Sequence, residues 1–397
     1  MNSANEESTS SLFSETLLAD PHGVYANLRG AAPVHRTTTP DGEPVWLITR
    51  YAEARTALAD PRLSLDKANA RTASGYRSSM PPELDAHLLN MDPPNHTRLR
   101  NLVSKAFTPR RVEGLRSRIQ TITDDLLDAP ADRRMDLMDT LAIPLPMHVI
   151  CDLLGIPAEA RLDFRAWTDT LLSPAPAAEE SRTAMRHMHR FLTGIIQGKR
   201  HHPGDDLLSA LTEARDDNDA LAEEELLSLA FLILFAGYDN AVNLIGNAAL
   251  GLLLHPEQMT AVRHGFVPIR AVIEETLRWN PPFPLGVRRF ATEDVMIGEE
   301  VIPAGDRVWV SIASANRDER EFKRPDDFDV GRGASHLTFG HGIHYCLGAP
   351  LARLEAEIAL CTLLDSFPVL ELASYGQPQW HSSFHKRGLQ SLLVVTA

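Results

Sequence analysis

The sequence has few cysteines and no segment typical of secretion or membrane insertion. Three cysteines in 397 residues give no disulfide framework and fit a reducing compartment. The first ten residues, M-N-S-A-N-E-E-S-T-S, contain neither a basic nor an apolar stretch, so no signal peptide is expected. The longest dense apolar run, Leu226 to Ala236, is too short to span a bilayer. We therefore expect a cytoplasmic protein without a membrane anchor.

The chain also lacks an excess of basic residues and any internal division. It has 39 Lys and Arg against 53 Asp and Glu, a formal net charge of −14, which argues against nucleic acid as a partner. No linker rich in Pro, Gly or Ser and no repeat divides it. We expect a disordered tail over residues 1–12 and one domain with a large core over residues 13–397.

Glycine is concentrated around one cysteine near the C-terminus. Residues 339–348 read F-G-H-G-I-H-Y-C-L-G. Apolar residues with the spacing of one helical face follow this segment: Leu351, Leu354, Ile358 and Cys361. Pro350 suits the first turn of that helix. Cys346 is therefore expected in a loop at a helix N-terminus, where unpaired N–H groups and the helix dipole favour a thiolate.

The glycines of this loop narrow the chemistry of the thiolate. Without side chains at Gly340, Gly342 and Gly348, a large flat group can approach the backbone. A zinc knuckle is excluded because no second cysteine lies nearby, whereas an axial thiolate ligand of a haem iron fits. The alternative is a glycine turn around a buried structural cysteine. Cys151 and Cys361 fall in apolar helical patterns and are expected in the core.

The pattern F-G-x-G-x-H-x-C-x-G in residues 339–348 resembles the haem-binding signature of the cytochromes P450, and the resemblance extends over nearly the whole chain. It implies the mainly α cytochrome P450 fold of the soluble bacterial type, a single triangular helical domain with a small β-rich subdomain. It also implies haem b (iron protoporphyrin IX) as the cofactor. Cys346 is then the iron ligand, and Phe339 belongs to the haem-binding loop.

Four basic residues are similar to those that hold the haem propionates in this family. His96 and Arg100, in D-P-P-N-H-T-R-L-R, are four residues apart and share a helical face. Arg289 precedes Phe290, and His344 lies in the cysteine loop. A His/Arg pair alone is more often a solvated helix face, but the sequence around this pair favours propionate binding through charge-assisted hydrogen bonds.

The longest helical pattern, residues 222–254, contains a glycine that indicates a packing or functional need. Gly in a helix interior costs roughly 1 kcal/mol relative to Ala, and Ala236-Gly237 opens a notch in the helix. In the family this helix crosses the haem and the notch admits O2; close helix packing is the alternative. The family pattern, small-Gly-x-acid-Thr, retains its acid as Asp239 but has Asn240 in place of the alcohol.

We expect Asp239 and Asn240 to be catalytic, positioning water and protons, although Asn240 puts the usual proton relay in doubt. The alternative for Asn240 is that it only satisfies a helix carbonyl. The resemblance also implies an apolar substrate pocket lined by Leu232, Phe235, Ala236, Leu285 and Val287. Phe384 and His385, in a C-terminal turn, are expected to close it.

The remaining elements follow from local patterns and from the resemblance. Strands are expected at 44–50, 284–297, 301–312 and 391–395. A loop is expected over 61–90, and the helices at 158–172 and 180–200 are expected to roof the pocket. Glu275 and Arg278 form an E-x-x-R pattern, which resembles the structural ion pair of the family, with Arg332 as a candidate third member.

The implied activity is monooxygenation. One atom of O2 enters a C–H bond or double bond of a lipophilic small molecule of secondary metabolism, and the other leaves as water. Electrons are expected from a separate acidic ferredoxin or flavodoxin. It would dock on residues 96–118, where seven Lys and Arg against Glu113 give a net charge of +6. Three alternatives stay open: oxidative coupling without oxygen insertion, a peroxide-driven enzyme, and a non-enzymatic haem sensor.

Overall fold

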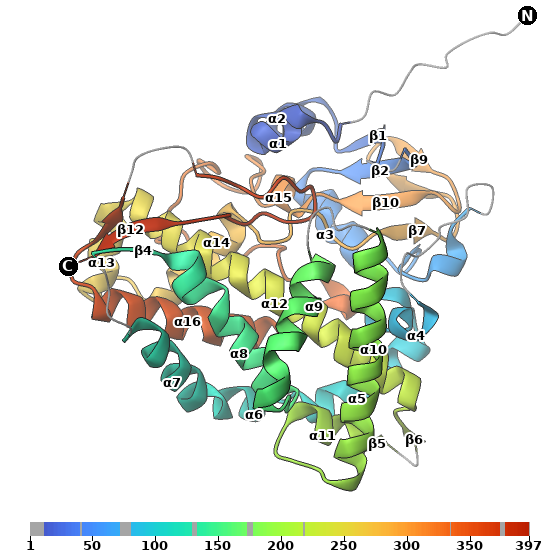
Figure 1. Ribbon diagram of the computed structural model, residues 1–397. Coiled ribbons are helices and arrows are strands. Elements are labelled where there is room, and N and C mark those ends of the chain that lie inside the picture. The colour runs from blue at the N-terminus through green and yellow to red at the C-terminus, as the bar shows by residue number, and fades with distance from the viewer. Residues whose placement is uncertain are drawn as a thin grey trace, which may run out of the picture.

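The computed structural model describes residues 12–39, 42–71, 81–128, 133–172, 178–216, 219–333, 335–373 and 378–396. The fold is mainly α with small sheets, as predicted (Figure 1). The expected tail lies outside the described residues except for Leu12, whose backbone N–H donates to Thr37 Oγ1 at 3.0 Å. Of the expected loop 61–90, residues 72–80 also lie outside them.

The β-rich part contains a five-stranded sheet in the order β1-β2-β10-β7-β3. Its strands are β1 (Val34–Thr38), β2 (Pro44–Ile48), β3 (Leu63–Ser64), β7 (Arg289–Ala291) and β10 (Arg307–Val310). The helices beside it are α1 (Glu15–Ala19), α2 (Pro21–Ala31), α3 (Tyr51–Ala59) and α15 (Ile312–Ala315). The strand expected at 44–50 is β2, which pairs antiparallel with β1 and parallel with β10.

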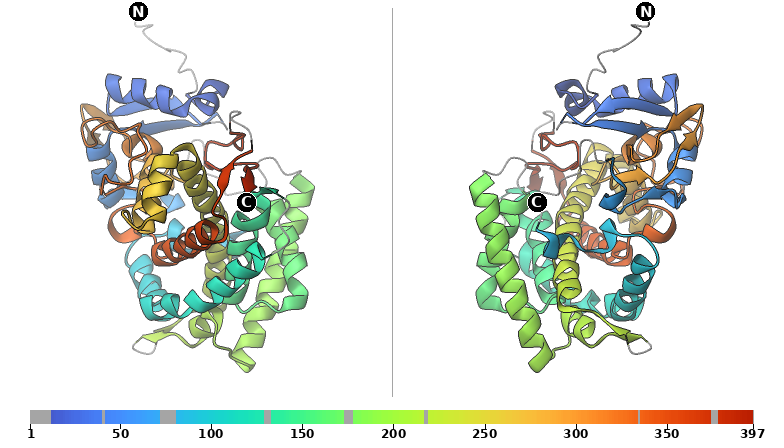
Figure 2. Two further views of the ribbon diagram at one scale, coloured as in Figure 1. Left: turned by 90° about the vertical axis from the view of Figure 1, so that its left-hand side faces the viewer. Right: turned by 90° about the vertical axis from the view of Figure 1, so that its right-hand side faces the viewer.

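The larger helical part lies below and to the left of this sheet in Figure 1. Its first helices are α4 (Pro82–Asp85), α5 (Asn95–Ala106), α6 (Pro109–Gly114), α7 (Arg116–Leu127), α8 (Pro144–Leu153), α9 (Arg161–Leu172) and α10 (Ala178–His201). Its later helices are α11 (Leu207–Glu213), α12 (Glu223–Leu254), α13 (Pro256–Arg263), α14 (Ile269–Trp279) and α16 (Ala349–Ser366). The two expected roof helices are α9 and α10, which lie opposite the β-rich part in Figure 2.

The smaller elements complete the chain. A three-stranded sheet has the order β11-β12-β4, from Leu370–Leu372, Leu393–Thr396 and Arg134–Asp136. Two hairpins are β5–β6 (Arg215–Asp216, Asp219–Ala220) and β8–β9 (Val295–Ile297, Glu300–Ile302). Single helical turns are η1 (Lys67–Asn69), η2 (Leu88–Asn90), η3 (Met138–Ala142), η4 (Ala158–Ala160) and η5 (Gly342–His344).

The prediction of one strand over 284–297 was wrong. The segment contains β7 and β8, which belong to different sheets. Between them Thr292 donates its backbone N–H to Arg62 O, and the chain then turns into the β8–β9 hairpin at Gly298, whose φ is +62°. All three residues of β7 are buried, whereas β8 alternates buried and exposed residues, so the alternation in the sequence does not mark the break between the two strands.

Helix α12 is the centre of the helical part. It packs against α8, α14, α16, α4 and α10. The side chain of Glu225 accepts the backbone N–H of Ala222 at 2.9 Å, and three glutamates in the first turn favour the positive end of the helix dipole. By length and composition α12 could cross a membrane, but 61% of its apolar window is buried within the protein, as expected of a core helix.

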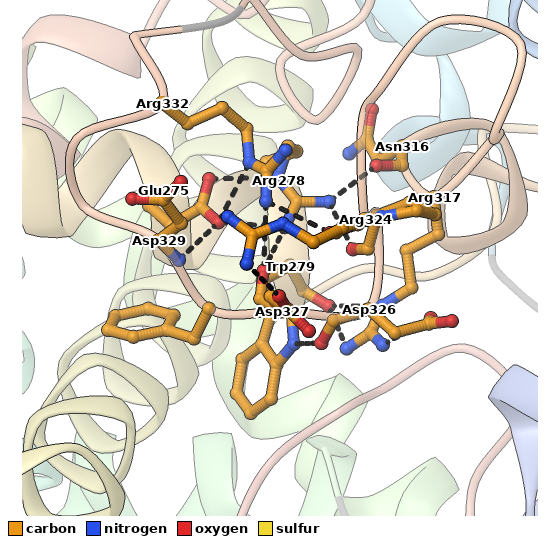
Figure 3. Close-up of polar contacts among 12 residues, drawn as sticks. Glu275, Arg278, Trp279, Asn316, Arg317, Arg324, Asp326, Asp327, Asp329 and Arg332 are labelled. Atoms are coloured by element: carbon orange, nitrogen blue, oxygen red, sulfur yellow. Dashed lines mark hydrogen bonds and ion pairs between the residues drawn. The ribbon is translucent and has the colours of Figure 1, made fainter.

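The predicted E-x-x-R ion pair fixes the loop that leads to Cys346 (Figure 3). Arg278 is fully buried and donates to both carboxylate oxygens of Glu275, at 2.7 and 2.8 Å. It also donates to the carbonyl oxygens of Asn316, Pro325 and Asp327. Arg332 Nε lies 3.2 Å from Glu275 Oε1, so the third member is confirmed. Arg278 thus satisfies backbone carbonyls of an irregular segment in which no neighbouring β-strand of the described chain supplies the hydrogen bonds.

Candidate functional site

Cys346 lies in a tight loop directly before α16. Its backbone N–H donates to Phe339 O at 2.8 Å, and Gly340 N–H donates to Leu337 O at 2.8 Å. Gly340 and Gly342 have φ values of +77° and +78°, which side-chain-bearing residues rarely adopt. A Cβ on Gly342 would also lie 3.0 Å from Ala59 Cα. Both glycines are therefore needed to form the loop and, at Gly342, to let it approach α3.

The thiol of Cys346 is accessible, yet protein atoms enclose it on most sides. This burial raises the pKa of the Cys346 thiol. Backbone N–H groups of Gly348 and Ala349 and the guanidinium groups of Arg100 and Arg353 act in the opposite direction. The loop therefore supplies hydrogen bonds and positive charge for a thiolate, and a metal cation would complete its stabilisation.

The other two cysteines have no such surroundings. Cys151 in α8 is fully buried, and burial raises the pKa of its thiol to about 11. Cys361 in α16 is partly buried, and burial raises the pKa of its thiol as well. Cys151 is in the core, as predicted, whereas the prediction of a core position for Cys361 was wrong, because it lies on a half-buried face of α16.

The four basic residues predicted to hold propionates converge beside Cys346. The rings of His96 and His344 lie 4.2 Å apart, centroid to centroid. Arg100 Nη2 donates to Tyr345 O at 2.6 Å. Burial and the neighbouring His96, Arg289 and Arg100 lower the pKa of His344 to about 3. Such mutual depression of basic pKa values indicates a cluster that is short of negative charge.

Two buried nitrogens of this cluster have no hydrogen-bond partner within the described part of the chain. They are His96 Nε2 and Arg289 Nε. The two terminal nitrogens of Arg289 donate to Leu63 O and Leu58 O, at 2.9 and 3.0 Å, and burial lowers its pKa to about 10. Buried donors are almost always satisfied in folded proteins. Anionic carboxylates beside a Cys ligand would satisfy these, so the residues present fit haem with its two propionates.

Arg353 is a residue of this site that the sequence reasoning missed. Its guanidinium lies 4.5 Å from the centroid of the Phe339 ring and donates to both oxygens of Glu274, at 2.6 and 2.9 Å. Although burial alone raises it, these bonds and one from His336 lower the pKa of Glu274 to about 2. Arg353 thereby links the ring of Phe339, the first residue of the cysteine loop, to Glu274 of α14. The available signal was L-A-R, directly after the glycine-rich loop.

The middle of α12 is open although both ends are buried. Residues 226–231 and 241–253 are buried, whereas Leu232 and Phe235 are half-buried and Ala236 and Gly237 are exposed. Solvent therefore reaches the centre of this core helix at Ala236 and Gly237. Three of the predicted pocket residues therefore share one open stretch of the central helix.

The two predicted catalytic residues have different partners. Asp239 Oδ1 lies 2.6 Å from Lys386 Nζ, and Asp239 Oδ2 accepts from Asn243 Nδ2 at 3.3 Å. Asn240 Nδ2 donates to Ala236 O, one turn back in the same helix, at 2.9 Å. This hydrogen bond favours the structural alternative for Asn240. Neither Lys386 nor Asn243 was anticipated, because nothing in the sequence links the C-terminal turn to α12.

Leu285 does not share the open stretch. It is fully buried in a cluster with Tyr25, Leu47 and Trp309, so its side chain cannot line a hollow. The prediction failed because α1 and α2, which were not foreseen, cover this side of the β-rich part. Val287 is half-buried.

The two residues expected to close the pocket also contact the β-rich part. Phe384 packs edge-on against Phe13, with ring centroids 5.3 Å apart. The ring of His385 lies 5.2 Å from that of Trp309. Both rings thus pack against aromatic residues of the β-rich part, and in this C-terminal turn it is Lys386 that reaches α12.

A cysteine in a glycine-rich loop at a helix N-terminus, with a basic cluster beside it and an open central helix, defines a haem-thiolate protein. Residues 269–382 match the sequence model of the family Cytochrome P450. The chain is 46% identical over 392 residues to cytochrome P450 107B1 of Saccharopolyspora erythraea, covering 96% of each chain. The chain belongs to the cytochrome P450 family and is a monooxygenase with haem b as its cofactor.

Solved structures agree with this assignment. The P450 PksS of the Bacillus subtilis bacillaene polyketide synthase has a TM-score of 0.91 and 37% identity, covering 97% of this chain and 99% of that one. The tirandamycin C-bound monooxygenase TamI has a TM-score of 0.86 and 44% identity, covering 97% and 99%. The predicted fold class and family are confirmed.

Proposed function

We propose that this P450 hydroxylates or epoxidises a lipophilic, polyketide-type secondary metabolite in a pocket beside the open stretch of α12. The observation that carries the proposal is the convergence of Cys346 with four basic residues that form no ion pair within the described part of the chain, two of which leave a buried nitrogen without a hydrogen-bond partner. The substrate class is taken from relatives, one belonging to a polyketide synthase and one bound to tirandamycin C. It suits the apolar Leu232, Phe235 and Ala236.

The proximal residues would hold the cofactor in one orientation. Haem b, when bound, supplies the activation of O2. Cys346 would ligate its iron, and the basic cluster of His96, Arg100, Arg289 and His344 would neutralise its propionates through charge-assisted hydrogen bonds. The Arg353–Phe339 contact would keep the cysteine loop rigid.

The distal residues would hold the substrate and supply protons. Leu232, Phe235 and Ala236 would give the pocket an apolar wall that excludes water. A Cβ on Gly237 would lie 3.3 Å from Ile150 Cδ1, so this glycine serves close packing against α8. The Asp239 carboxylate, at the edge of this wall, would hold and pass on a proton. Asn240 would not share that role, because its amide does not ionise near neutral pH, and one of its two N–H groups donates to Ala236 O.

The electron donor would be an acidic ferredoxin or flavodoxin. The structure reduces the predicted docking patch, because three of its arginines are already paired with acids. Arg98 forms an ion pair with Glu225, Arg116 with Glu113 and Glu357, and Arg118 with Asp152. Arg110 is exposed and Arg111 is half-buried, and neither forms an ion pair within the described part of the chain. We propose these two arginines, at the start of α6, as the core of the docking surface.

Replacement of Cys346 by serine tests the proposed ligand. The reduced wild-type protein under carbon monoxide should show the strongly red-shifted Soret band of a thiolate-ligated haem. Cys346→Ser should lose this band, because a serine hydroxyl does not ionise at neutral pH. Cys361→Ser, in α16 and away from the cysteine loop, is the matched control and should retain the band. A thiolate band in Cys346→Ser would refute the assignment.

Product mass separates oxygen insertion from oxidative coupling. With a bound substrate, insertion adds one oxygen atom, and turnover under labelled O2 should place the label in the product. A product that has lost hydrogen without gaining the label would instead establish coupling. Turnover with peroxide and no reductase would establish the peroxide-driven alternative.

A further inference from the structure

A lysine from the C-terminal turn reaches the acid of the central helix. Lys386 Nζ lies 2.6 Å from Asp239 Oδ1, and the side chains of both residues are only 18% exposed. The two residues are 147 positions apart in the sequence. A partly buried ion pair of this kind is less screened by solvent than a surface pair, and it fixes the position of both side chains.

The turn that carries Lys386 is tied to the core on both sides of the lysine. Arg387 donates its backbone N–H to Pro282 O at 2.9 Å, and its guanidinium lies 3.7 Å from the centroid of the Trp380 ring. Asn247 of α12 donates to Arg387 O at 2.9 Å. A Cβ on Gly388 would lie 1.9 Å from Asn243 Oδ1, so only glycine lets the turn approach α12 this closely.

The other titratable groups near the Asp239–Lys386 pair are Asp169, Arg165, His381 and Tyr238. Asp169 and Arg165 of α9 form their own ion pair at 3.5 Å, and burial raises the pKa of Asp169. Burial lowers the pKa of His381, and Lys386 lowers it further. Burial likewise raises the pKa of Tyr238. Among these groups Lys386 is the cation in direct contact with Asp239.

We propose that Lys386 is a positioning residue that holds the Asp239 carboxylate at the edge of the open stretch of α12 for proton delivery. The proposal rests on the proposed role of Asp239. Because the Asn240 amide does not ionise near neutral pH, Asp239 is the residue of the two that can pass on a proton, and the geometry of its carboxylate decides where the proton is delivered. Lys386 and Asn243 each bind one carboxylate oxygen, so together they set its rotation as well as its place.

The test compares Lys386→Met and Lys386→Arg in the haem-loaded enzyme with a bound substrate. Misplacement of a catalytic group can cost up to about 10²-fold in rate, so we expect Lys386→Met to lower kcat roughly tenfold with KM changed less than about twofold. More reducing equivalents should appear as hydrogen peroxide, and the solvent deuterium isotope effect on kcat should rise. Lys386→Arg, which keeps a cation, should recover most of the coupling.

Hydrogen exchange gives a readout independent of activity. Backbone amides of residues 381–388 should exchange roughly fivefold faster in Lys386→Met, since a tether of the turn is lost. The swapped pair Asp239→Lys with Lys386→Asp should restore the slow exchange but not the coupling. Lys323→Met, at an exposed lysine, is the matched control and should change neither.

The outcomes separate this inference from the proposed function. If Asp239→Asn is uncoupled but Lys386→Met is not, the role of Lys386 is refuted and that of Asp239 stands. If Asp239→Asn couples normally, the proposed role of Asp239 fails, and the inference fails with it. If the swapped pair restores coupling, the charge pair is only a structural tether and the positioning role is wrong.

Discussion

At the scale of single residues, Asn240 stands where the family pattern has an alcohol, and the structure shows which group its side chain hydrogen-bonds. One of its two amide N–H groups donates to Ala236 O at 2.9 Å, one turn back in the same helix. We expect Asn240→Ala to change the product formed per reduced nicotinamide by less than about twofold, because only one hydrogen bond within the helix is lost. Hydrogen peroxide released per nicotinamide is the direct measurement. A large increase in Asn240→Ala would restore Asn240 to the proton route.

A buried glutamate, Glu355, is a second single residue with a testable effect: it makes the free energy of unfolding depend on pH. Glu355 of α16 is fully enclosed, its Oε2 has no hydrogen-bond partner in the described chain, and burial raises its pKa from 4.5 to about 8. Below about pH 4.5 the carboxyl is neutral in both states. Between about pH 4.5 and 8 only the unfolded state ionises, so the free energy of unfolding falls as pH rises, by roughly 1.4 kcal/mol per pKa unit.

Glu355→Gln should therefore remove the fall in the free energy of unfolding between about pH 4.5 and 8. Its free energy of unfolding relative to wild type should increase from about pH 5 to about pH 8 and then stay constant, as measured by urea unfolding of the haem-loaded protein. Glu357→Gln is the control of opposite sign. Although burial alone raises the pKa of Glu357, Arg270 and Arg116 lower it overall, so that variant should lose stability above the acid range. Equal pH profiles for Glu355→Gln and wild type would contradict the raised pKa.

At the scale of elements, α12 owes its close packing to glycines that are not exchangeable for alanine. A Cβ on Gly251 would lie 2.9 Å from Phe328 Cζ, an atom of a rigid ring in the core. Overpacking of this kind costs about 1–3 kcal/mol. It should outweigh the gain of up to about 1 kcal/mol that alanine brings to a helix interior. We expect Gly251→Ala to lower the Tm.

The matched control for Gly251 is Gly198, inside α10. No heavy atom lies within 4 Å of its added Cβ, so Gly198→Ala should raise the Tm through helix propensity alone. Thermal unfolding of both variants, with the haem content verified, makes the comparison. A Tm raised by both substitutions would show that Phe328 moves aside at little cost.

At the scale of the whole molecule, the net charge of −14 repels an acidic donor, so docking would depend on the local basic surface at Arg110 and Arg111. We expect Arg110→Glu with Arg111→Glu to slow the first electron transfer from an acidic ferredoxin roughly tenfold at low salt. The wild-type rate should also fall as salt rises, since the Debye length is about 10 Å at 0.1 M. Stopped-flow reduction measures both effects. Arg182→Glu on α10 is the control, and a double variant as fast as wild type would exclude this surface.

The sequence by itself determined the chemistry that is local along the chain. The glycines around Cys346, the helix after it, the long helix α12 and the Glu275–Arg278 pair each depend on neighbours within a few residues, which periodicity and turn chemistry reveal. The convergence of the propionate-type cluster was implied by the family resemblance and is present in the structure.

Tertiary structure decided what depends on residues far apart in the chain. Leu285 is core because α1 and α2 cover it, three arginines of the basic segment are neutralised by acids on other elements, and Asn240 turns back onto its own helix. The Lys386–Asp239 pair joins residues 147 positions apart. The spacing of charged and apolar residues shows which face of a helix or strand must be buried or paired. Which residues it packs against depends on the packing of the whole chain, and no local pattern encodes that.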